Sequence, residues 1–166
     1  MNLSVVGTGY VGLVTGTCFA ETGNHVICVD VDAEKVEKMR KGEIPIYEPG
    51  LEVIFERNSR QGRLHFTTDL RYAVENSDII FLALPTPPGG DGAADLSYIM
   101  GVAAELSTMI QSYKVIVDKS TVPVGTAEKV HAILAQSLSE DLFDVVSNPE
   151  SLREGVAVED FLKPDR

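Results

Sequence analysis

Six short runs of apolar and β-branched residues recur along the chain, and each one predicts a β-strand. Most of these runs are continuous rather than alternating with polar residues, which is typical of strands covered on both faces of a parallel sheet. The predicted strands span residues 3–6, 25–29, 64–67, 79–84, 114–117 and 143–146.

Longer stretches of helix-forming residues lie between these runs, so strand and helix alternate about five times. The predicted helices span residues 10–22, 33–41, 51–60, 96–111 and 127–136. This alternation predicts an α/β fold with a doubly wound parallel sheet of the Rossmann type. A chain of 166 residues fits a single domain, which we expect to span residues 1–166.

Two loops rich in proline and glycine interrupt the alternation of strands and helices. IPIYEPG, at residues 44–50, carries two prolines and predicts a fixed loop rather than a helix. PTPPGGDGAAD, at residues 85–95, follows the fourth predicted strand. Long loops at the carboxyl ends of strands are where open α/β sheets bind ligands, so this end of the sheet is the expected site.

The charge balance narrows the range of ligands and partners. The chain has 14 lysines and arginines against 25 aspartates and glutamates, for a net charge of -11. A surface that tracks the phosphates of a nucleic acid needs an excess of basic residues, so we expect no nucleic-acid partner. The phosphates of any ligand must instead be held by backbone N–H groups and helix ends.

Nothing in the sequence indicates a membrane or a metal. No run approaches the roughly 18 apolar residues of a membrane span, and no basic segment precedes the first short apolar run. We therefore expect a cytoplasmic protein with no membrane partner. The three histidines are scattered, and Cys18 and Cys28 lack the spacing of metal ligands, so we expect no metal site.

The stretch GTGYVG follows the first predicted strand and opens the first predicted helix. Gly7, Gly9 and Gly12 have the G-x-G-x-x-G spacing of a dinucleotide-binding loop. The first allows a tight turn, the second lets the backbone approach a pyrophosphate, and the third lets the helix pack closely on the strand. The unpaired N–H groups at the start of the helix would then meet the pyrophosphate.

An acidic residue stands where a dinucleotide site needs one. Asp30 ends the second predicted strand, where a carboxylate would accept hydrogen bonds from the adenosine ribose hydroxyls. Such a carboxylate repels a 2′-phosphate, so NAD is favoured over NADP as the cofactor. Asp32 is a second candidate for this role, although its position before a helix also suits a helix cap.

Hydroxyl side chains follow the fourth and fifth predicted strands, on the same edge of the sheet. Ser120 and Thr121, in KSTVPVGT, could contact a ligand, cap a helix that begins with Pro123, or do both. Thr86 lies among prolines, which could form a rigid turn or a wall beside the nicotinamide half of the cofactor.

Two glutamates, Glu150 and Glu154, follow the sixth predicted strand. If a helical turn begins near Pro149, their spacing of four places both carboxylates on one face. Such a pair could order a water molecule or act as acid and base. The alternative is a solvated helix N-terminus, where acidic residues are common.

Five stretches together resemble the UDP-glucose/GDP-mannose dehydrogenase family, in the family's order along the whole chain. They are GTGYVGLVTGTCFAETGNHVICVDVDAEKV, IPIYEPGL, LPTPPGGDGAADLSYI, VDKSTVPVGT and SNPESLREGVAVEDFLKPDR. The run GAADLSYI and the EPGL loop fit the UDP-glucose branch better than the GDP-mannose branch. The resemblance implies that two NAD are reduced in succession as the 6-hydroxymethyl group of UDP-glucose becomes a carboxylate, through a thiohemiacetal and a thioester on a cysteine.

The resemblance also implies roles for individual positions. Residues implied to bind the cofactor are Gly7, Gly9, Tyr10, Val11, Gly12, Asp30, Lys35, Thr86, Thr121 and Glu154. Residues implied to bind the nucleotide-sugar substrate are Glu150, Ser151, Leu152, Arg153 and Glu154. The implied catalytic residues are Thr121, Glu150 and Glu154, of which the first two help to position a water molecule or a proton.

The chain departs from the family pattern in two ways. The family usually has phenylalanine at Ser151, and losing that ring would remove up to about 3 kcal/mol of apolar packing if the site is buried. The family's nucleophilic cysteine, with its assisting lysine and asparagine, belongs to a later domain. Cys18, in the glycine-loop helix, and Cys28, inside a strand, cannot replace it.

We therefore expect the NAD-binding N-terminal part of a longer enzyme, without the central helix and the C-terminal UDP-sugar domain. This part is expected to be inactive alone, and the full-length protein is expected to form a homodimer or a larger assembly. Two alternatives stay open. One is a GDP-mannose or UDP-aminosugar dehydrogenase domain, and the other is a stand-alone, non-catalytic NAD-binding module.

Overall fold

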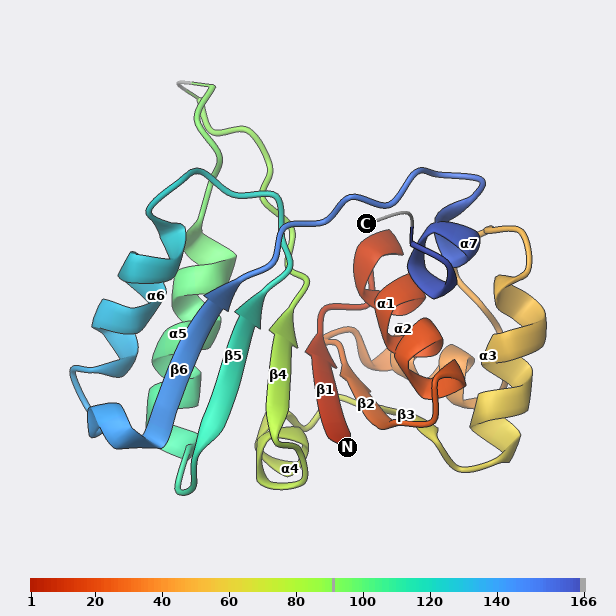
Figure 1. The fold of residues 1–166 in the computed structure, drawn as a ribbon, viewed down its shortest axis with the longest axis horizontal. Coiled ribbons are helices and arrows are strands. Elements are labelled where there is room, and N and C mark those ends of the chain that lie inside the picture. The colour runs from red at the N-terminus through yellow and green to blue at the C-terminus, as the bar shows by residue number, and fades with distance from the viewer. Residues whose placement is uncertain (91, 165–166) are drawn as a thin grey trace.

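The structure is a computed structural model that describes residues 1–90 and 92–164, and its centre is a six-stranded sheet (Figure 1). The strands are β1 (Asn2–Val6), β2 (His25–Val29), β3 (Leu64–Thr67), β4 (Ile79–Leu82), β5 (Lys114–Asp118) and β6 (Phe143–Ser147). Every neighbouring pair is parallel, in the order β3-β2-β1-β4-β5-β6. The chain winds outward from β1 and then from β4, which confirms the predicted doubly wound, Rossmann-type fold.

Helices connect the strands and cover both faces of the sheet. They are α1 (Tyr10–Glu21), α2 (Ala33–Arg40), α3 (Leu51–Arg60), α4 (Leu70–Glu75), α5 (Ser97–Met109), α6 (Thr126–Leu134), α7 (Ala157–Leu162) and the 3-10 helix η1 (Glu140–Leu142). Five of them match predicted helices. The other three were not predicted, because six residues or fewer are too short to display a helical period.

Two apolar cores lie on opposite faces of the sheet. On one face, α1, α2 and α3 pack on β1, β2 and β3. On the other face, α4, α5 and α6 pack on β1, β4, β5 and β6. Because each buried strand contributes alternate side chains to the two cores, both faces of a strand are apolar, as its sequence indicated.

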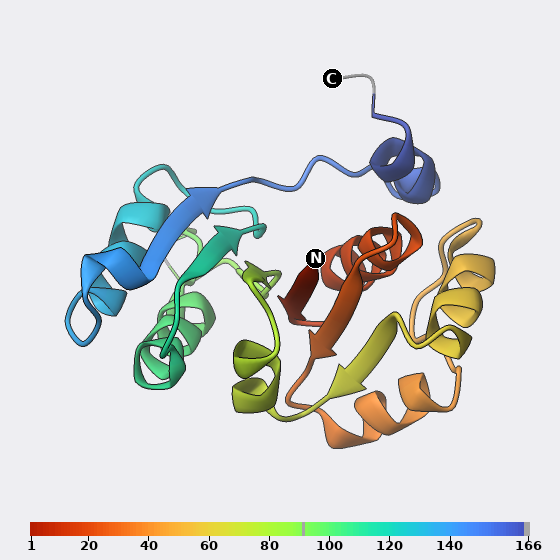
Figure 2. The same ribbon diagram turned by 60° about the horizontal axis from the view of Figure 1, so that its bottom comes forward.

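The last part of the chain returns to the first. After β6 the segment of residues 148–156 runs across the carboxyl ends of the strands, and α7 then packs beside α1 and α3 (Figures 1 and 2). Phe161 in α7 meets Phe19 in α1 edge-on, with ring centroids 4.9 Å apart. This return brings residues 148–156 close to the glycine loop.

Three residues lie outside the described part of the chain. They are Asp91, in the predicted loop of residues 85–95, and Asp165 and Arg166, at the end of the predicted domain. Within residues 1–90 and 92–164, no helix has both the length and the apolar character to cross a membrane.

Candidate dinucleotide-binding site

The loop between β1 and α1 leaves the amino end of α1 without a side-chain cap. Gly9 is the N-cap residue of α1, which has no side-chain cap and no acidic residue in its first turn. A Cβ atom added to Gly9 would meet no protein atom within 4 Å, so the space beside this residue is open. The N–H groups of the first helical turn are therefore available to a negatively charged ligand.

The other two glycines of the loop are required by close packing. Gly7 has a φ of +100°, and a Cβ atom there would lie 2.2 Å from the carbonyl oxygen of Ala83. A Cβ atom on Gly12 would lie 1.9 Å from the carbonyl oxygen of Gly7. These positions therefore cannot carry a side chain without moving the backbone. The contacts of Gly7, Gly9, Tyr10, Val11 and Gly12 with a pyrophosphate stay a prediction.

Asp30 lies just after β2, beside the glycine loop. Its Oδ2 atom accepts hydrogen bonds from the backbone N–H of Thr8 at 3.2 Å, from the Thr8 hydroxyl, and from Lys35 Nζ at 3.0 Å. Burial raises the pKa of Asp30. The hydrogen bonds from the Thr8 side chain, the Asp32 backbone and the Lys35 side chain outweigh burial and hold the pKa below its ordinary value. The group is therefore a carboxylate at neutral pH, able to accept hydrogen bonds from hydroxyls.

The structure separates the two aspartates that the sequence left as candidates. Asp32 is the N-cap residue of α2, and its Oδ1 atom accepts a hydrogen bond from the backbone N–H of Lys35 at 3.0 Å. Asp30 instead faces Thr8, in the glycine loop. The capping alternative for Asp32 is confirmed, and Asp30 is left as the candidate for the ribose.

The loops that follow β4 and β5 are joined at the same edge of the sheet. The Thr86 hydroxyl donates to the carbonyl oxygen of Thr121 at 3.0 Å. The buried Ser120 hydroxyl bonds to the backbone N–H and carbonyl oxygen of Leu84, both at 3.0 Å. Thr86 and Thr121 are thus held side by side, whereas Ser120 holds the loops together and is not available to a ligand.

The helix predicted over residues 127–136 is present as α6, but the alternative in which a helix begins with Pro123 is wrong. Helix α6 begins at Thr126, with Gly125 as its N-cap residue at a φ of +91°. This left-handed conformation interrupts any helix running on from Pro123. Neither Ser120 nor Thr121 caps α6, so the capping alternative for these two residues falls away.

No helical turn begins near Pro149, although the shared face of Glu150 and Glu154 depended on one. Residues 148–153 have no regular secondary structure, and α7 begins only at Ala157. The Glu150 carboxylate bends back and accepts a hydrogen bond from the backbone N–H of Leu152, a local bond that competes with helix formation. Glu150 and Glu154 therefore do not share a helix face as predicted.

The remaining residues of the predicted substrate segment point in different directions. Leu152 packs against the apolar cluster of α1, α3 and α7. Arg153 forms an ion pair with Asp160, at 2.6 Å between Nη2 and Oδ1. Ser151 is exposed, so the burial that would make the loss of a phenylalanine ring costly is not met within this domain. Substrate contacts by residues 150–154 stay a prediction.

A buried cationic residue reaches the base of this segment. Lys119, 8% exposed, donates from Nζ to the Asn148 side-chain oxygen at 3.2 Å. Burial lowers the pKa of Lys119, and the nearby charge of Glu150 opposes that shift. The sequence offered no signal for this contact, because β5 and β6 become neighbours only in the folded sheet.

Glu48 is a second residue that the sequence did not single out. It is 4% exposed although it lies in the IPIYEPG loop, and it accepts a hydrogen bond from the Tyr10 hydroxyl at 2.5 Å. Tyr10, Glu48 and Glu154 line one pocket of about 460 Å³, together with Ile46, Tyr47, Pro49 and Gly155. The only sequence signal was a charged residue inside a loop fixed by prolines.

Neither cysteine has the character of a nucleophile. Burial raises the pKa of Cys28 to about 12. Burial, with the charges of Glu21 and Glu48, raises the pKa of Cys18 to about 12 as well. Both thiols stay protonated at neutral pH, and a protonated thiol attacks carbon poorly. Within residues 1–90 and 92–164, no group of three or more His, Cys, Asp or Glu could hold a metal ion.

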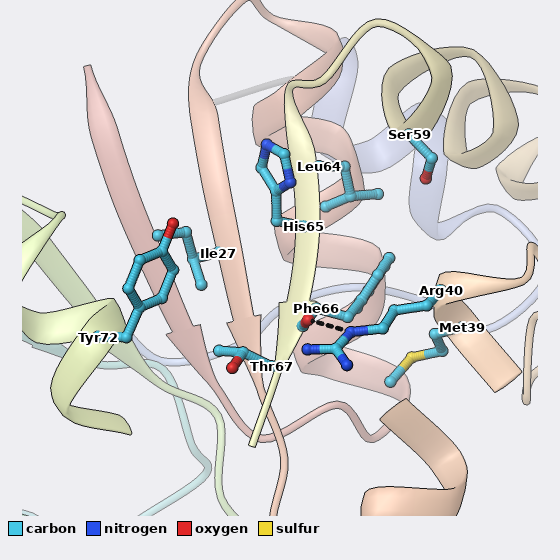
Figure 3. Close-up of a pocket in the computed structure, with 9 residues that line it drawn as sticks. All are labelled: Ile27, Met39, Arg40, Ser59, Leu64, His65, Phe66, Thr67 and Tyr72. Atoms are coloured by element: carbon cyan, nitrogen blue, oxygen red, sulfur yellow. Dashed lines mark hydrogen bonds between the residues drawn. The ribbon is translucent and has the colours of Figure 1, made fainter. Parts of the chain in front are cut away.

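Another pocket, of about 380 Å³, lies around the edge strand β3 (Figure 3). Its lining residues are Ile27, Met39, Arg40, Ser59, Leu64, His65, Phe66, Thr67 and Tyr72. Arg40 donates from Nε to the carbonyl oxygen of Phe66 at 2.9 Å, which covers part of the strand edge. None of these residues belongs to the glycine loop or to residues 148–156, so this pocket is separate from the candidate site.

Comparison with known proteins gives a match over the whole chain. The sequence profile of the UDP-glucose/GDP-mannose dehydrogenase family, NAD binding domain, matches residues 1–166. The UDP-glucose 6-dehydrogenase of Rhizobium meliloti (strain 1021) is 50% identical over 167 residues, which are 100% of this chain and 38% of that protein. The UDP-glucose 6-dehydrogenase TuaD of Bacillus subtilis (strain 168) is 50% identical over 99% of this chain and 36% of that protein.

Solved structures of nucleotide-sugar dehydrogenases also match nearly the whole chain. A UDP-glucose dehydrogenase from Pyrobaculum islandicum has a TM-score of 0.93 and 45% identity, over 99% of this chain and 39% of that one. A ternary complex of GDP-mannose dehydrogenase from Pseudomonas aeruginosa has a TM-score of 0.94 and 37% identity, over 99% of this chain and 39% of that one. The chain thus spans less than two fifths of the length of these relatives.

Proposed function

The chain belongs to the UDP-glucose/GDP-mannose dehydrogenase family as its NAD-binding domain, and from that premise we propose that it serves a UDP-glucose 6-dehydrogenase. The observation that carries the proposal is the open amino end of α1 at Gly9, beside the charged Asp30. Relatives at 50% identity that are UDP-glucose 6-dehydrogenases support UDP-glucose as the sugar. The oxidation itself belongs to a longer protein.

In this proposal each part of the site has a task. NAD, when bound, supplies the acceptor for a hydride. The first turn of α1 holds the pyrophosphate through N–H groups, since a helix N-terminus favours negative charge. Asp30 accepts hydrogen bonds from the adenosine ribose, with Lys35 beside it. Thr86 and Thr121, joined by their hydrogen bond, form the wall beside the nicotinamide.

The substrate side of the proposal involves the segment after β6. Residues Glu150, Ser151, Leu152, Arg153 and Glu154 line the sugar. Thr121 and Glu150 position a water molecule or a proton, and for this the Glu150 carboxylate must leave the backbone N–H of Leu152. Competition binding on the longer protein tests the sugar: UDP-glucose should displace a labelled nucleotide sugar at lower concentration than GDP-mannose or a UDP-aminosugar does.

We predict that the 166-residue chain binds NAD but turns over no sugar. Both thiols are buried and protonated, so no nucleophile is available to carry the thiohemiacetal. Incubation with UDP-glucose and NAD should give no sustained rise in NADH absorbance, while calorimetry detects NAD binding. Sustained turnover would show that the chain holds its own nucleophile. A non-catalytic NAD-binding module would also bind NAD without turnover. Turnover of UDP-glucose by the longer protein distinguishes an enzyme domain from such a module.

Replacing Asp30 by asparagine should weaken the preference for NAD over NADP. The variant loses a charged acceptor for the ribose hydroxyls and no longer repels a 2′-phosphate, so we expect NAD to bind at least about tenfold more weakly. NADP should lose less affinity than NAD or gain some. The measurement is calorimetric titration with both cofactors. Asp32→Asn is the matched control, because it changes the same charge at the cap of α2 and should keep the preference for NAD.

A further inference from the structure

The carboxylate of Glu48 joins three segments that are far apart in the sequence. Its Oε2 atom accepts hydrogen bonds from the Tyr10 hydroxyl at 2.5 Å and from the backbone N–H of Gly155 at 2.9 Å. Its Oε1 atom accepts a hydrogen bond from the backbone N–H of Ala157 at 2.7 Å. One buried side chain thus links the IPIYEPG loop, the first residue of α1 and the turn that leads into α7.

The bonding explains how a carboxylate can remain charged in a buried place. Burial raises the pKa of Glu48, but the hydrogen bonds from Tyr10 and from the backbone N–H groups of Gly155, Ala157 and Val158 outweigh it, and the pKa is below its ordinary value. Hydrogen bonds to an ionised acceptor are the stronger kind. The three backbone N–H donors belong to α7 and its preceding turn, and they would otherwise be unpaired.

We propose that Glu48 is a positioning residue that holds the segment of residues 148–156 against the cofactor loop. Tyr10 directly follows Gly9, where the cofactor pyrophosphate is expected, and Gly155 directly follows Glu154. Because Glu48 binds both neighbours, it sets the distance between the glycine loop and Glu154. This proposal rests on the proposed function, since it assigns the segment to the cofactor and sugar site.

Packing alone does not hold the segment in this way. Ala157 and the rest of α7 contact α1 and α3 through apolar side chains, and apolar contacts are non-directional. Residues 148–153 have no regular structure of their own. Among the residues described, Glu48 is the side chain that accepts hydrogen bonds from both Gly155 and Ala157. It therefore supplies the directional contacts that fix Glu154 beside Tyr10.

The test uses Glu48→Gln in the 166-residue chain, with Glu52→Gln as the matched control. Both oxygens of Glu48 accept from N–H groups, so an amide group turned either way places a donor against a donor. Glu52 is exposed in the first turn of α3, so its replacement makes the same change of charge without touching this network. Hydrogen exchange of the Gly155 and Ala157 amides should be at least about tenfold faster in Glu48→Gln.

NAD titration followed by amide NMR gives a readout that a purely structural role would not move. In the wild-type chain and in Glu52→Gln, NAD should shift the glycine-loop amides and also those of Gly155 and Ala157. In Glu48→Gln, NAD should still shift the glycine-loop amides but no longer those of Gly155 and Ala157. NAD should also bind about fivefold more weakly. Tyr10→Phe keeps the Glu48 bonds to the backbone N–H groups of Gly155 and Ala157. It should leave the exchange of these amides within about twofold of wild type and reduce the shifts that NAD causes in them.

The outcomes separate the two ideas. If NAD shifts no glycine-loop amide in the wild-type chain, the proposed function fails. If NAD binds but Glu48→Gln matches Glu52→Gln in amide exchange and in transmitted shifts, the positioning role of Glu48 is wrong. Should Glu48→Gln not fold, Tyr10→Phe decides: transmitted shifts equal to those of wild type would overturn the proposal.

Discussion

Replacing Gly9 by alanine is expected to weaken NAD binding by at least about 100-fold, or about 2.7 kcal/mol, while the fold stays intact. The backbone of Gly9, with a φ of -68° and a ψ of -171°, suits alanine as well as glycine. The new methyl group would meet no protein atom within 4 Å, so the folded chain accommodates it. It would instead occupy the space through which a pyrophosphate must approach the N–H groups of α1.

Calorimetric titration with NAD measures the effect, and thermal unfolding followed by circular dichroism shows whether the fold survives. Gly101→Ala is the matched control, because Gly101 lies within α5 and its added Cβ atom would also have no neighbour within 4 Å. The control should bind NAD like wild type and be slightly more stable, by up to about 1 kcal/mol. Binding of NAD by Gly9→Ala within threefold of the control would mean that the cofactor does not lie at the glycine loop.

Replacing Gly12 by alanine is expected to have the largest effect on stability. The added methyl carbon would lie 1.9 Å from the carbonyl oxygen of Gly7, and that oxygen belongs to the backbone and cannot turn aside. Either α1 or the end of β1 must move, although both are packed in the core. We expect a loss of about 3 kcal/mol or more, within the range of severe overpacking.

Urea unfolding gives the free energy directly, and the melting temperature should fall by about 6 to 12 °C for a chain of this size. Gly101→Ala again serves as the control. Equal stability of Gly12→Ala and Gly101→Ala would show that α1 does not approach β1 as closely as the structure has it. Loss of NAD binding without loss of stability would assign Gly12 to ligand contact rather than to packing.

The two glycine variants together separate the roles within one short loop. Gly9 faces open space, so its replacement should affect the ligand alone. Gly12 faces the backbone, so its replacement should affect the fold first and the ligand only as a consequence. A spacing pattern assigns all the glycines to one motif, and only coordinates show which of them meets a ligand.

The site also shows what the domain contributes to a dehydrogenase. The glycine loop, Asp30 and the Thr86–Thr121 pair lie at the carboxyl ends of neighbouring strands, where the strand order reverses between β1 and β4. The segment after β6 crosses the same edge and ends at α7, which is held by Glu48. A nucleotide sugar contacting residues 150–154 would therefore be close to the cofactor.

Local patterns were sufficient for the fold class and for NAD as the cofactor. Buried parallel strands are apolar on both faces, so each strand appeared as a continuous apolar run in the sequence. The glycine spacing reflects a steric requirement, and the acid after the second strand reflects a charge requirement. Both features lie between Gly7 and Asp30, so they can be read from one short stretch of sequence. Asp32 as a helix cap is likewise a local feature, since its carboxylate bonds to a residue three positions on.

Tertiary packing decided the conformation of the segment after β6 and the hydrogen-bond partners of Glu48. The spacing of Glu150 and Glu154 suggested one helix face, but the bond from Leu152 to Glu150 and the late start of α7 give an irregular segment. Glu48 and Gly155 are 107 positions apart, and no pattern within either segment announces their contact. Short-range periodicity reports which face of an element is buried, whereas the partners of a buried polar group depend on how distant segments dock.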